Sequence, residues 1–145
     1  VRWLNSGLID VSITLLPVSG DDIVSRELDR DRLIQVSSQP RSAMAWDENY
    51  IYVDLGAGFR RQHSLAWPAD NTARTAFGSS NWALDYLLRK SGSAYLPWRL
   101  CGPYVEAGRL HVVRDVPEFS RSVYFNCRNA SAQEYPWLLP DRQSM

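Results

Sequence analysis

The chain has 145 residues, 45% of them hydrophobic and 22% charged, a composition typical of a soluble globular protein with one domain or two small lobes. Lys and Arg number 16, as do Asp and Glu, so the chain lacks the basic excess that marks a nucleic-acid-binding face. His63, His111, Cys101 and Cys127 form no metal-binding motif, and we expect neither a metal nor another cofactor.

The first part of the chain predicts the end of a helix and then two strands. Residues 2–6 are typical of a last helical turn, which Gly7 would close in the left-handed conformation. Residues 8–16 are apolar and β-branched and predict a buried strand. The run 26–32 alternates in charge and predicts an exposed, self-neutralising face, and residues 33–37 predict the second strand.

Strands and helices alternate through the middle of the chain. We expect strands at 50–54, 72–77 and 93–96, and helices at 59–67 and about 81–90. This alternation predicts parallel βαβ units with right-handed crossovers.

The last third predicts shorter elements. Residues 97–107 open with a proline that suits a helix start, but Gly102-Pro103 favours two short turns over one helix. Strands are expected at 110–114 and 122–127, and a helix broken by proline at 130–139.

Four motifs stand in fixed order and together cover nearly the whole chain. They are residues 7–13 (GLIDVSI), 33–36 (LIQV), 91–97 (SGSAYLP) and 108–125, in which Gly108-Arg109-Leu110 precedes Val113, Pro117 and the strand Val123-Tyr124-Phe125. In this order the motifs resemble the effector domain of LysR-type transcriptional regulators. The resemblance departs at Lys90, where the family often has the first of two glycines. The family's helix-turn-helix, its linker helix and the first strand and helix of its sensing domain have no counterpart here.

The resemblance implies an α/β fold of the two-lobed, periplasmic-binding-protein-like type 2 class. Lobe I would hold residues 1–36 and 119–145, and lobe II residues 37–118. Two crossover strands, near Val36 and Phe119, would join the lobes. Lobe I is expected to be incomplete, because the chain starts without Met and soon enters a strand, which suggests that its natural beginning lies upstream.

The resemblance also implies a function without catalysis. We expect a cytoplasmic sensor that binds a small, anionic effector in the cleft between the lobes and forms a homodimer or tetramer. DNA would be reached only through the absent N-terminal helix-turn-helix domain. No apolar run approaches the roughly 20 residues that cross a bilayer, and no signal peptide is evident, so no membrane contact is expected.

Ligands of open α/β sheets bind beyond the carboxyl ends of the strands, where helix N-termini attract anions. Two segments follow such strand ends: Gly56-Ala57-Gly58-Phe59 and Ser79-Ser80-Asn81. The alternatives are an ordinary strand-to-helix turn and an ordinary helix cap. Thr14 would face the cleft from the other lobe, and Gly92 and Ser93 would border the pocket, although Gly92 also suits a purely geometric role.

Three other functions stay open at this stage. A solute-binding protein for transport would share the architecture. A small α/β enzyme would need a site around Asp54, His63 and Ser64, but adjacent side chains on a helix diverge. A redox sensor would need Cys101 and Cys127 within about 7 Å of each other, and we expect them to be apart and reduced. Arg60 or Arg61 could pair with an acidic effector, or both could be solvated.

Overall fold

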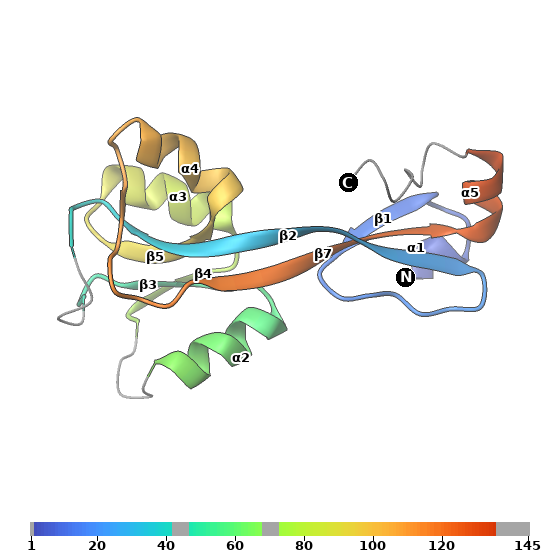
Figure 1. The fold of residues 1–145 in the computed structure, drawn as a ribbon, viewed down its shortest axis with the longest axis horizontal. Helices are drawn as coiled ribbons and strands as arrows, with labels where there is room; N and C mark the ends of the chain where they lie inside the picture. Colours follow the sequence, from blue (N-terminus) through green and yellow to red (C-terminus); the bar gives the residue numbers. More distant parts are fainter. Residues whose placement is uncertain (1, 42–46, 68–72, 136–145) are drawn as a thin grey trace. The chain divides into compact units, whose positions relative to one another are not determined.

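The computed structural model describes residues 2–41, 47–67 and 73–135 (Figure 1). The chain divides into two compact units, which we call unit 1 (residues 1–30 and 122–145) and unit 2 (residues 31–121). Two long strands, β2 (Ile23–Ser37) and β7 (Phe119–Arg128), are neighbours in one sheet, and each has residues in both units. The predicted lobe boundary after residue 36 falls in β2, and the predicted boundary before residue 119 falls where β7 begins.

Unit 1 contains an antiparallel strand pair between two short helices. β1 pairs with β7, so that Thr14 lies opposite Tyr124. Gly7 has a φ of 78°, the left-handed conformation predicted for the residue that follows the first helix. The buried side chain of Asn126 donates from Nδ2 to Thr14 Oγ1 over 2.9 Å, which ties the two strands together. The elements of this part are α1 (Arg2–Asn5), β1 (Val11–Thr14) and α5 (Asn129–Glu134).

The prediction of a long, buried strand over residues 8–16 is wrong in both respects. The strand has only the four residues of β1, and Ile13 on it is 59% exposed. Leu8 and Leu16, outside the strand, are exposed as well. β1 is the end strand of its sheet among the described residues, so its apolar side chains have a neighbouring strand on one side only.

Unit 2 carries the parallel pairing that the sequence predicts. β3 and β4 run parallel, with Val53 beside Phe77, and a parallel bridge joins Tyr50 to Ser93 at the start of β5. β5 in turn pairs antiparallel with β2, and β6 extends the other edge of β2. The elements are β3 (Ile51–Val53), α2 (Ala57–Ala66), β4 (Thr75–Phe77), α3 (Ser80–Arg89), β5 (Ser93–Pro97), α4 (Trp98–Glu106) and β6 (His111–Val112).

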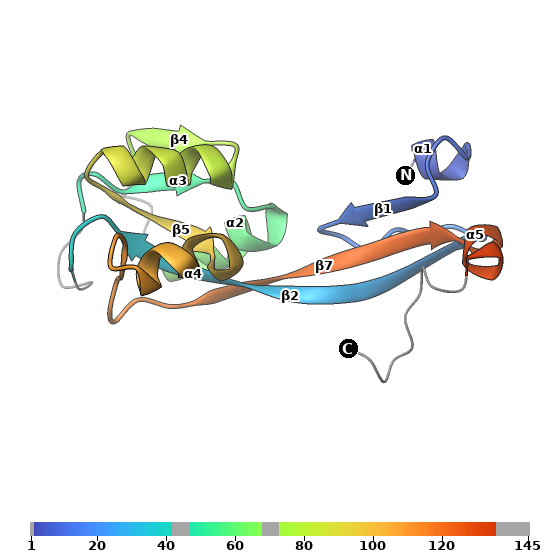
Figure 2. The same ribbon diagram turned by 90° about the horizontal axis from the view of Figure 1, so that it is seen from above.

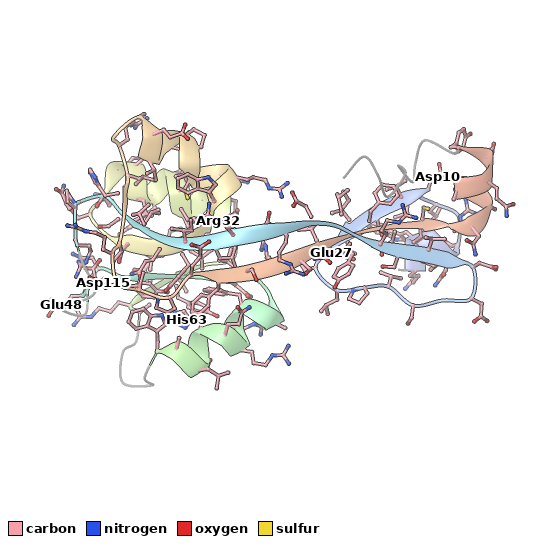
Figure 3. The ribbon with its side chains drawn as sticks, in the orientation of Figure 1. Asp10, Glu27, Arg32, Glu48, His63 and Asp115 are labelled. Carbon is pink, nitrogen blue, oxygen red and sulfur yellow. The ribbon has the colours of Figure 1, made fainter. Side chains whose placement is uncertain are left out.

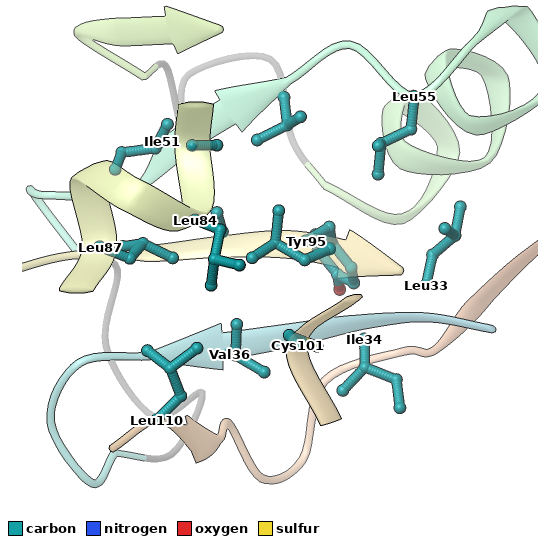
Figure 4. Packing of buried hydrophobic residues seen from close by; sticks show 14 of the residues in the cluster. Leu33, Ile34, Val36, Ile51, Leu55, Leu84, Leu87, Tyr95, Cys101 and Leu110 are labelled. Carbon is teal, nitrogen blue, oxygen red and sulfur yellow. The ribbon is translucent and has the colours of Figure 1, made fainter. Parts of the chain in front are cut away.

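The main hydrophobic core lies in unit 2 (Figure 4). α3 packs against the three strands β3, β4 and β5 (Figure 2), because Ala83, Leu84 and Leu87 share one buried face. β5 is buried along its whole length, as expected of a strand covered on both faces. The buried cluster also includes Leu33, Ile34, Val36, Ile51, Val53, Leu55, Phe59, Tyr95, Leu96, Cys101 and Leu110.

Residues 98–106 form one helix, α4, and not the two turns that Gly102-Pro103 predicts. Two packing contacts explain the difference. Cys101 is fully buried in the core, and a Cβ on Gly102 would lie 2.9 Å from the indole ring of Trp98. The helix therefore needs a residue without a side chain at this place, and the burial of its inner face outweighs its poor intrinsic propensity.

The charged run 26–32 is also more than an exposed face. It forms the middle of β2, and its residues 27–30 are exposed as predicted. Asp31, in contrast, is only 7% exposed. An ionised side chain at such a place needs charged or hydrogen-bonding partners, and those partners belong to the candidate site.

Candidate functional site

The carboxyl ends of three strands in unit 2 lie at one edge. Val53 and Phe77 are paired in the parallel register of β3 and β4, and the Tyr50–Ser93 bridge places β5 parallel to β3. A helix begins shortly after each strand, at Ala57, Ser80 and Trp98. None of these helices has an acidic residue in its first turn or a side-chain cap. Their N-termini therefore leave amide groups and partial positive charge at this edge.

The first of the two predicted segments is a turn that only glycine accommodates well. Gly56 has a φ of 102° and immediately precedes α2. Its amide donates to Asp54 Oδ1 over 3.2 Å, and the Asp54 amide donates to the Phe77 carbonyl over 3.0 Å. A Cβ on Gly58 would meet nothing within 4 Å, so the space outside the first helical turn is open.

The ring of Phe59 lies in the hydrophobic core. The ring is fully buried and lies 5.7 Å from the ring of Tyr95 and 5.8 Å from that of Phe119, measured between centroids. The aromatic ring therefore anchors α2 to the core.

The second predicted segment lies beside the first. Ser79 is the N-cap residue of α3 by position, but its hydroxyl makes no capping hydrogen bond. Ser79 and Ser80 are half-buried, and Asn81 is exposed. Because β3 and β4 are paired at Val53 and Phe77, the Gly56 turn and the start of α3 are brought to the same edge.

The structure does not bring Gly92 and Ser93 to this edge. Gly92 and Ser93 precede or begin β5, next to Tyr50 at the opposite end of the strands. The Gly92 carbonyl accepts hydrogen bonds from Ser37 and Ser38, and Ser93 Oγ donates to Asp47 over 2.6 Å. These contacts join β5 to its neighbours, which is a structural role.

Thr14 belongs to unit 1 and has local partners there. Its hydroxyl donates to the Leu16 carbonyl over 2.6 Å and accepts from Asn126. Both contacts are made within unit 1, and the contact with Asn126 joins β1 to β7.

Sequence reasoning missed an ionic cluster at the same edge of unit 2. Asp31 Oδ2 accepts a hydrogen bond from Arg121 Nε over 3.1 Å, and Arg99 Nη2, in the first turn of α4, lies 2.7 Å from Asp31 Oδ1. The Arg121 side chain is 20% exposed and that of Arg99 is 61% exposed. These residues lie far apart in the sequence, and Asp31 stands in the charged run 26–32, so no local signal marks its carboxylate as buried.

Arg121, on β7, and Gln62, on α2, connect β7 to the Gly56 turn. Arg121 Nη1 donates to the Leu55 carbonyl over 3.2 Å, directly before the turn. Gln62 Nε2 lies 3.2 Å from the Gly58 carbonyl and 3.0 Å from the Ser120 carbonyl, and it donates to both. We call these contacts of Arg121 and Gln62 the β7 clamp. The clamp holds the turn from both sides.

The residues considered for catalysis have other partners. His63 Nε2 lies 2.8 Å from the Tyr50 hydroxyl, and its ring extends from α2 (Figure 3) into a group of aromatic rings. Asp54 contacts Arg60, and Ser64 Oγ donates to the Arg60 carbonyl over 2.8 Å. Asp54, His63 and Ser64 therefore form no hydrogen-bonded relay in this structure.

Both cysteines are buried and unpaired, Cys101 in unit 2 and Cys127 in unit 1. Burial raises the pKa of the Cys101 thiol to about 11, and burial also raises the pKa of Cys127. Among the described residues, no group of three or more His, Cys, Asp and Glu side chains could hold a metal ion. No described helix is long and apolar enough to cross a membrane.

A separate hollow of about 370 Å³ lies along α3. Aromatic side chains of Phe77, Trp82 and Tyr86 line it together with Asp85, Arg89 and Lys90. Trp82 is 69% exposed, so the hollow is a shallow groove on the outside of the helix. No residue predicted to bind ligand lines this groove.

The chain is similar to known proteins in its fold but not detectably in its sequence. No known family profile matches the chain, and no curated protein matches it by sequence. Many solved structures match it in three dimensions.

Three of these structures show the extent of the similarity. Full-length LysG from Corynebacterium glutamicum, with bound effector arginine, has a TM-score of 0.69 at 15% identity, and the match covers 94% of this chain and 51% of LysG. The bromide-bound regulatory domain of HypT from Salmonella typhimurium has a TM-score of 0.71 at 15% identity, covering 94% and 74% of the two chains. A mutant OxyR2 regulatory domain from Vibrio vulnificus has a TM-score of 0.67 at 16% identity, covering 94% and 72%.

The chain thus has the fold of the regulatory domains of LysR-type regulators, and the predicted fold class, α/β of the periplasmic-binding-protein-like type 2, is confirmed. The chain spans about half the length of LysG and about three quarters of the separate regulatory domains.

Proposed function

We propose that this chain is the effector-sensing and oligomerisation part of a LysR-type transcriptional regulator, and that it binds a small anion at the carboxyl edge of unit 2. The observation that carries the proposal is the meeting of the Gly56 turn and the uncapped start of α3 at one sheet edge, in a fold shared with such regulatory domains. Backbone amides and a serine hydroxyl are suitable donors to a carboxylate.

The proposed action is a change in population between two states of the chain. An effector shifts such an equilibrium only as far as its affinities for the two states differ. DNA would be contacted by a helix-turn-helix domain outside this chain, in the cytoplasm. The neutral charge balance of the 145 residues supports this division of labour, because phosphate binding needs a basic surface.

A thermal-shift screen of small carboxylates, amino acids and aromatic acids tests the proposal. A ligand present at 100 times its dissociation constant stabilises the folded chain by about 2.7 kcal/mol. Replacing the Ser79 hydroxyl with S79A should weaken binding of any hit, whereas S64A, on the exposed side of α2, should not. Consumption of a hit compound by the purified chain would contradict the proposal and favour an enzyme.

The proposal assigns no ligand role to Gly92 and Ser93. Their hydrogen bonds to Ser37, Ser38 and Asp47 already account for their burial at the other end of β5. Arg60 is given no ligand role either, because its guanidinium lies 3.5 Å from Asp54.

A further inference from the structure

We infer that Arg121 and Gln62 are positioning residues that couple the Gly56 turn to the strands β2 and β7, so that an anion bound at the turn is sensed along those strands. The inference rests on the proposed function, because it concerns the regulation of the same site. Neither residue needs to touch the ligand. Each acts through the backbone carbonyls that flank the turn.

The first step is the geometry of the β7 clamp. Arg121 holds the Leu55 carbonyl, on the N-terminal side of Gly56, over 3.2 Å. Gln62 holds the Gly58 carbonyl, on the C-terminal side, over 3.2 Å and connects it to the Ser120 carbonyl over 3.0 Å. Two consecutive residues of β7 thus fix both ends of one glycine turn.

The second step is the conformational freedom of the turn itself. Gly56 has a positive φ, and an added Cβ on Gly58 would meet nothing within 4 Å. Glycines lose more backbone entropy on ordering than other residues, so a turn of this kind needs contacts from outside to keep its amides aligned. The clamp supplies those contacts, and a prealigned set of donors binds its ligand more tightly than a mobile one.

The third step connects the clamp to β2. Arg121 also donates from Nε to Asp31, which is 7% exposed. Breaking that contact would leave a buried carboxylate with fewer partners, so Arg121 resists being moved. A shift of the Leu55 carbonyl is therefore passed to Asp31 on β2 as well as to β7 itself.

The fourth step is where these strands lead. Asp31 and Arg121 are the first and last residues of unit 2, and β2 and β7 continue from them directly into unit 1. Within unit 1, Ser122 Oγ donates to Glu27 over 2.8 Å, so the two strands remain joined by side chains on that side also. The turn is thereby connected, through hydrogen bonds on β2 and β7, to backbone that belongs to both units.

The experiment is a bromide titration of the whole chain, followed by amide NMR. Bromide serves as a simple monovalent anion, and the readout is the shift of backbone amide signals at residues 57–59 and along β7. The variants are R121M, which removes all donors, R121K, which keeps one cationic group, and Q62M, which removes the second half of the clamp. R89M is the matched control, because Arg89 is an exposed arginine in the last turn of α3, at the other end of that helix from the proposed site.

We expect bromide to shift the turn amides and those of β7 together in the unchanged chain. In Q62M and R121M the apparent affinity should fall by about threefold to tenfold, and the β7 shifts should be lost before the turn shifts. R121K should recover part of the affinity, and R89M should match the unchanged chain. If R121M does not fold, Q62M provides the test, because Gln62 is half-buried on α2 and lies outside the hydrophobic core.

Two results would overturn the inference in distinguishable ways. If the unchanged chain binds bromide at the turn and both clamp variants bind it equally well with the same β7 shifts, the coupling is wrong and the proposed function stands. If the unchanged chain shows no shift at residues 57–59, the anion site is wrong and the coupling fails with it. A loss of thermal stability in Q62M with unchanged β7 shifts would count as a purely structural role.

Discussion

The hydroxyl of Tyr50 lies 2.8 Å from Nε2 of His63, so the residue that begins the parallel strand region is joined to the middle of α2. The two rings are stacked at 5.9 Å, and the rings of Tyr52 and Phe59 lie 5.3 Å from the imidazole. An imidazole enclosed in this way is partly desolvated, which disfavours its protonated form. His63 therefore belongs to the packing of α2 and not to an open site.

This environment predicts a loss of stability at mildly acidic pH. Burial lowers the pKa of His63 below its usual value of about 6.5, so the unfolded chain binds the proton more readily than the folded chain. The contribution of His63 to stability is fully present above the unfolded pKa and is lost as pH falls through the folded pKa. Urea unfolding measured between pH 7 and about pH 5 should show the free energy of unfolding falling as pH falls.

The variant H63Q separates this effect from the titration of carboxylates. Glutamine can still bond to the Tyr50 hydroxyl but does not ionise, so the variant should lose part of the slope that the unchanged chain shows. Identical pH profiles for the two proteins would mean that the protonation of His63 is not linked to folding.

Gly92 gives a second prediction, because it has no room for a side chain. A Cβ at this position would lie 2.7 Å from the Asn49 carbonyl oxygen and 3.4 Å from side-chain carbons of Ile51 and Leu87. The substitution G92A must displace backbone, and we expect it to destabilise the chain by about 1–3 kcal/mol in urea unfolding.

The matched control is G58A. Gly58 lies in the first turn of α2 with nothing within 4 Å of an added Cβ, so alanine should stabilise the chain by about 0.5–1 kcal/mol through helix propensity. Equal effects of the two substitutions would show that close packing at Gly92 is not what requires glycine there.

The order of elements in unit 2 could be predicted because each local pattern agrees with its environment. The strands near Tyr50 and Thr75 and the helices after Gly56 and Ser79 follow from periodicity and glycine placement alone. The prediction failed at Gly102-Pro103, where packing outweighs the poor helix propensity of these two residues. The absence of a side chain at Gly102 leaves room for the Trp98 indole one helical turn earlier, and Cys101 is buried in the core, so residues 98–106 form one helix.

The candidate site was predictable in part for the same reason. The Gly56 turn and the start of α3 follow apolar strands, and parallel pairing brings them together. The cluster of Asp31, Arg99 and Arg121 could not be predicted, because its members come from three elements whose contact depends on the full topology. Gly92 and Ser93 were expected near the effector, but the start of β5 lies at the other end of the parallel strands.

The two thiols should be slow to react in the folded chain. Cys101 and Cys127 are fully buried, and burial holds the pKa of Cys101 at about 11, so little thiolate exists near neutral pH. Titration with a disulfide reagent at pH 8 should label neither cysteine rapidly in the folded chain and both in urea. Fast labelling of either thiol in the folded chain would return the redox-sensor hypothesis to consideration.

The exposed side of β1 predicts self-association. β1 is the end strand of its sheet among the described residues, and Ile13 on it is 59% exposed, with exposed Leu8 and Leu16 on either side. A sheet edge with large apolar side chains is a template for pairing with another chain. Sedimentation measured over a range of concentrations should therefore show a monomer–oligomer equilibrium.

Substitution of Ile13 locates the contact. The variant I13S should weaken association by about tenfold, which corresponds to about 1.4 kcal/mol, because a serine removes most of the apolar surface at the centre of the strand. L65S is the matched control, since Leu65 is a more exposed apolar residue on α2 in unit 2, away from any strand edge. If I13S and L65S weaken association equally, the contact is a general apolar one and is not located at β1. If the unchanged chain stays monomeric at every concentration, the β1 edge is not used for pairing.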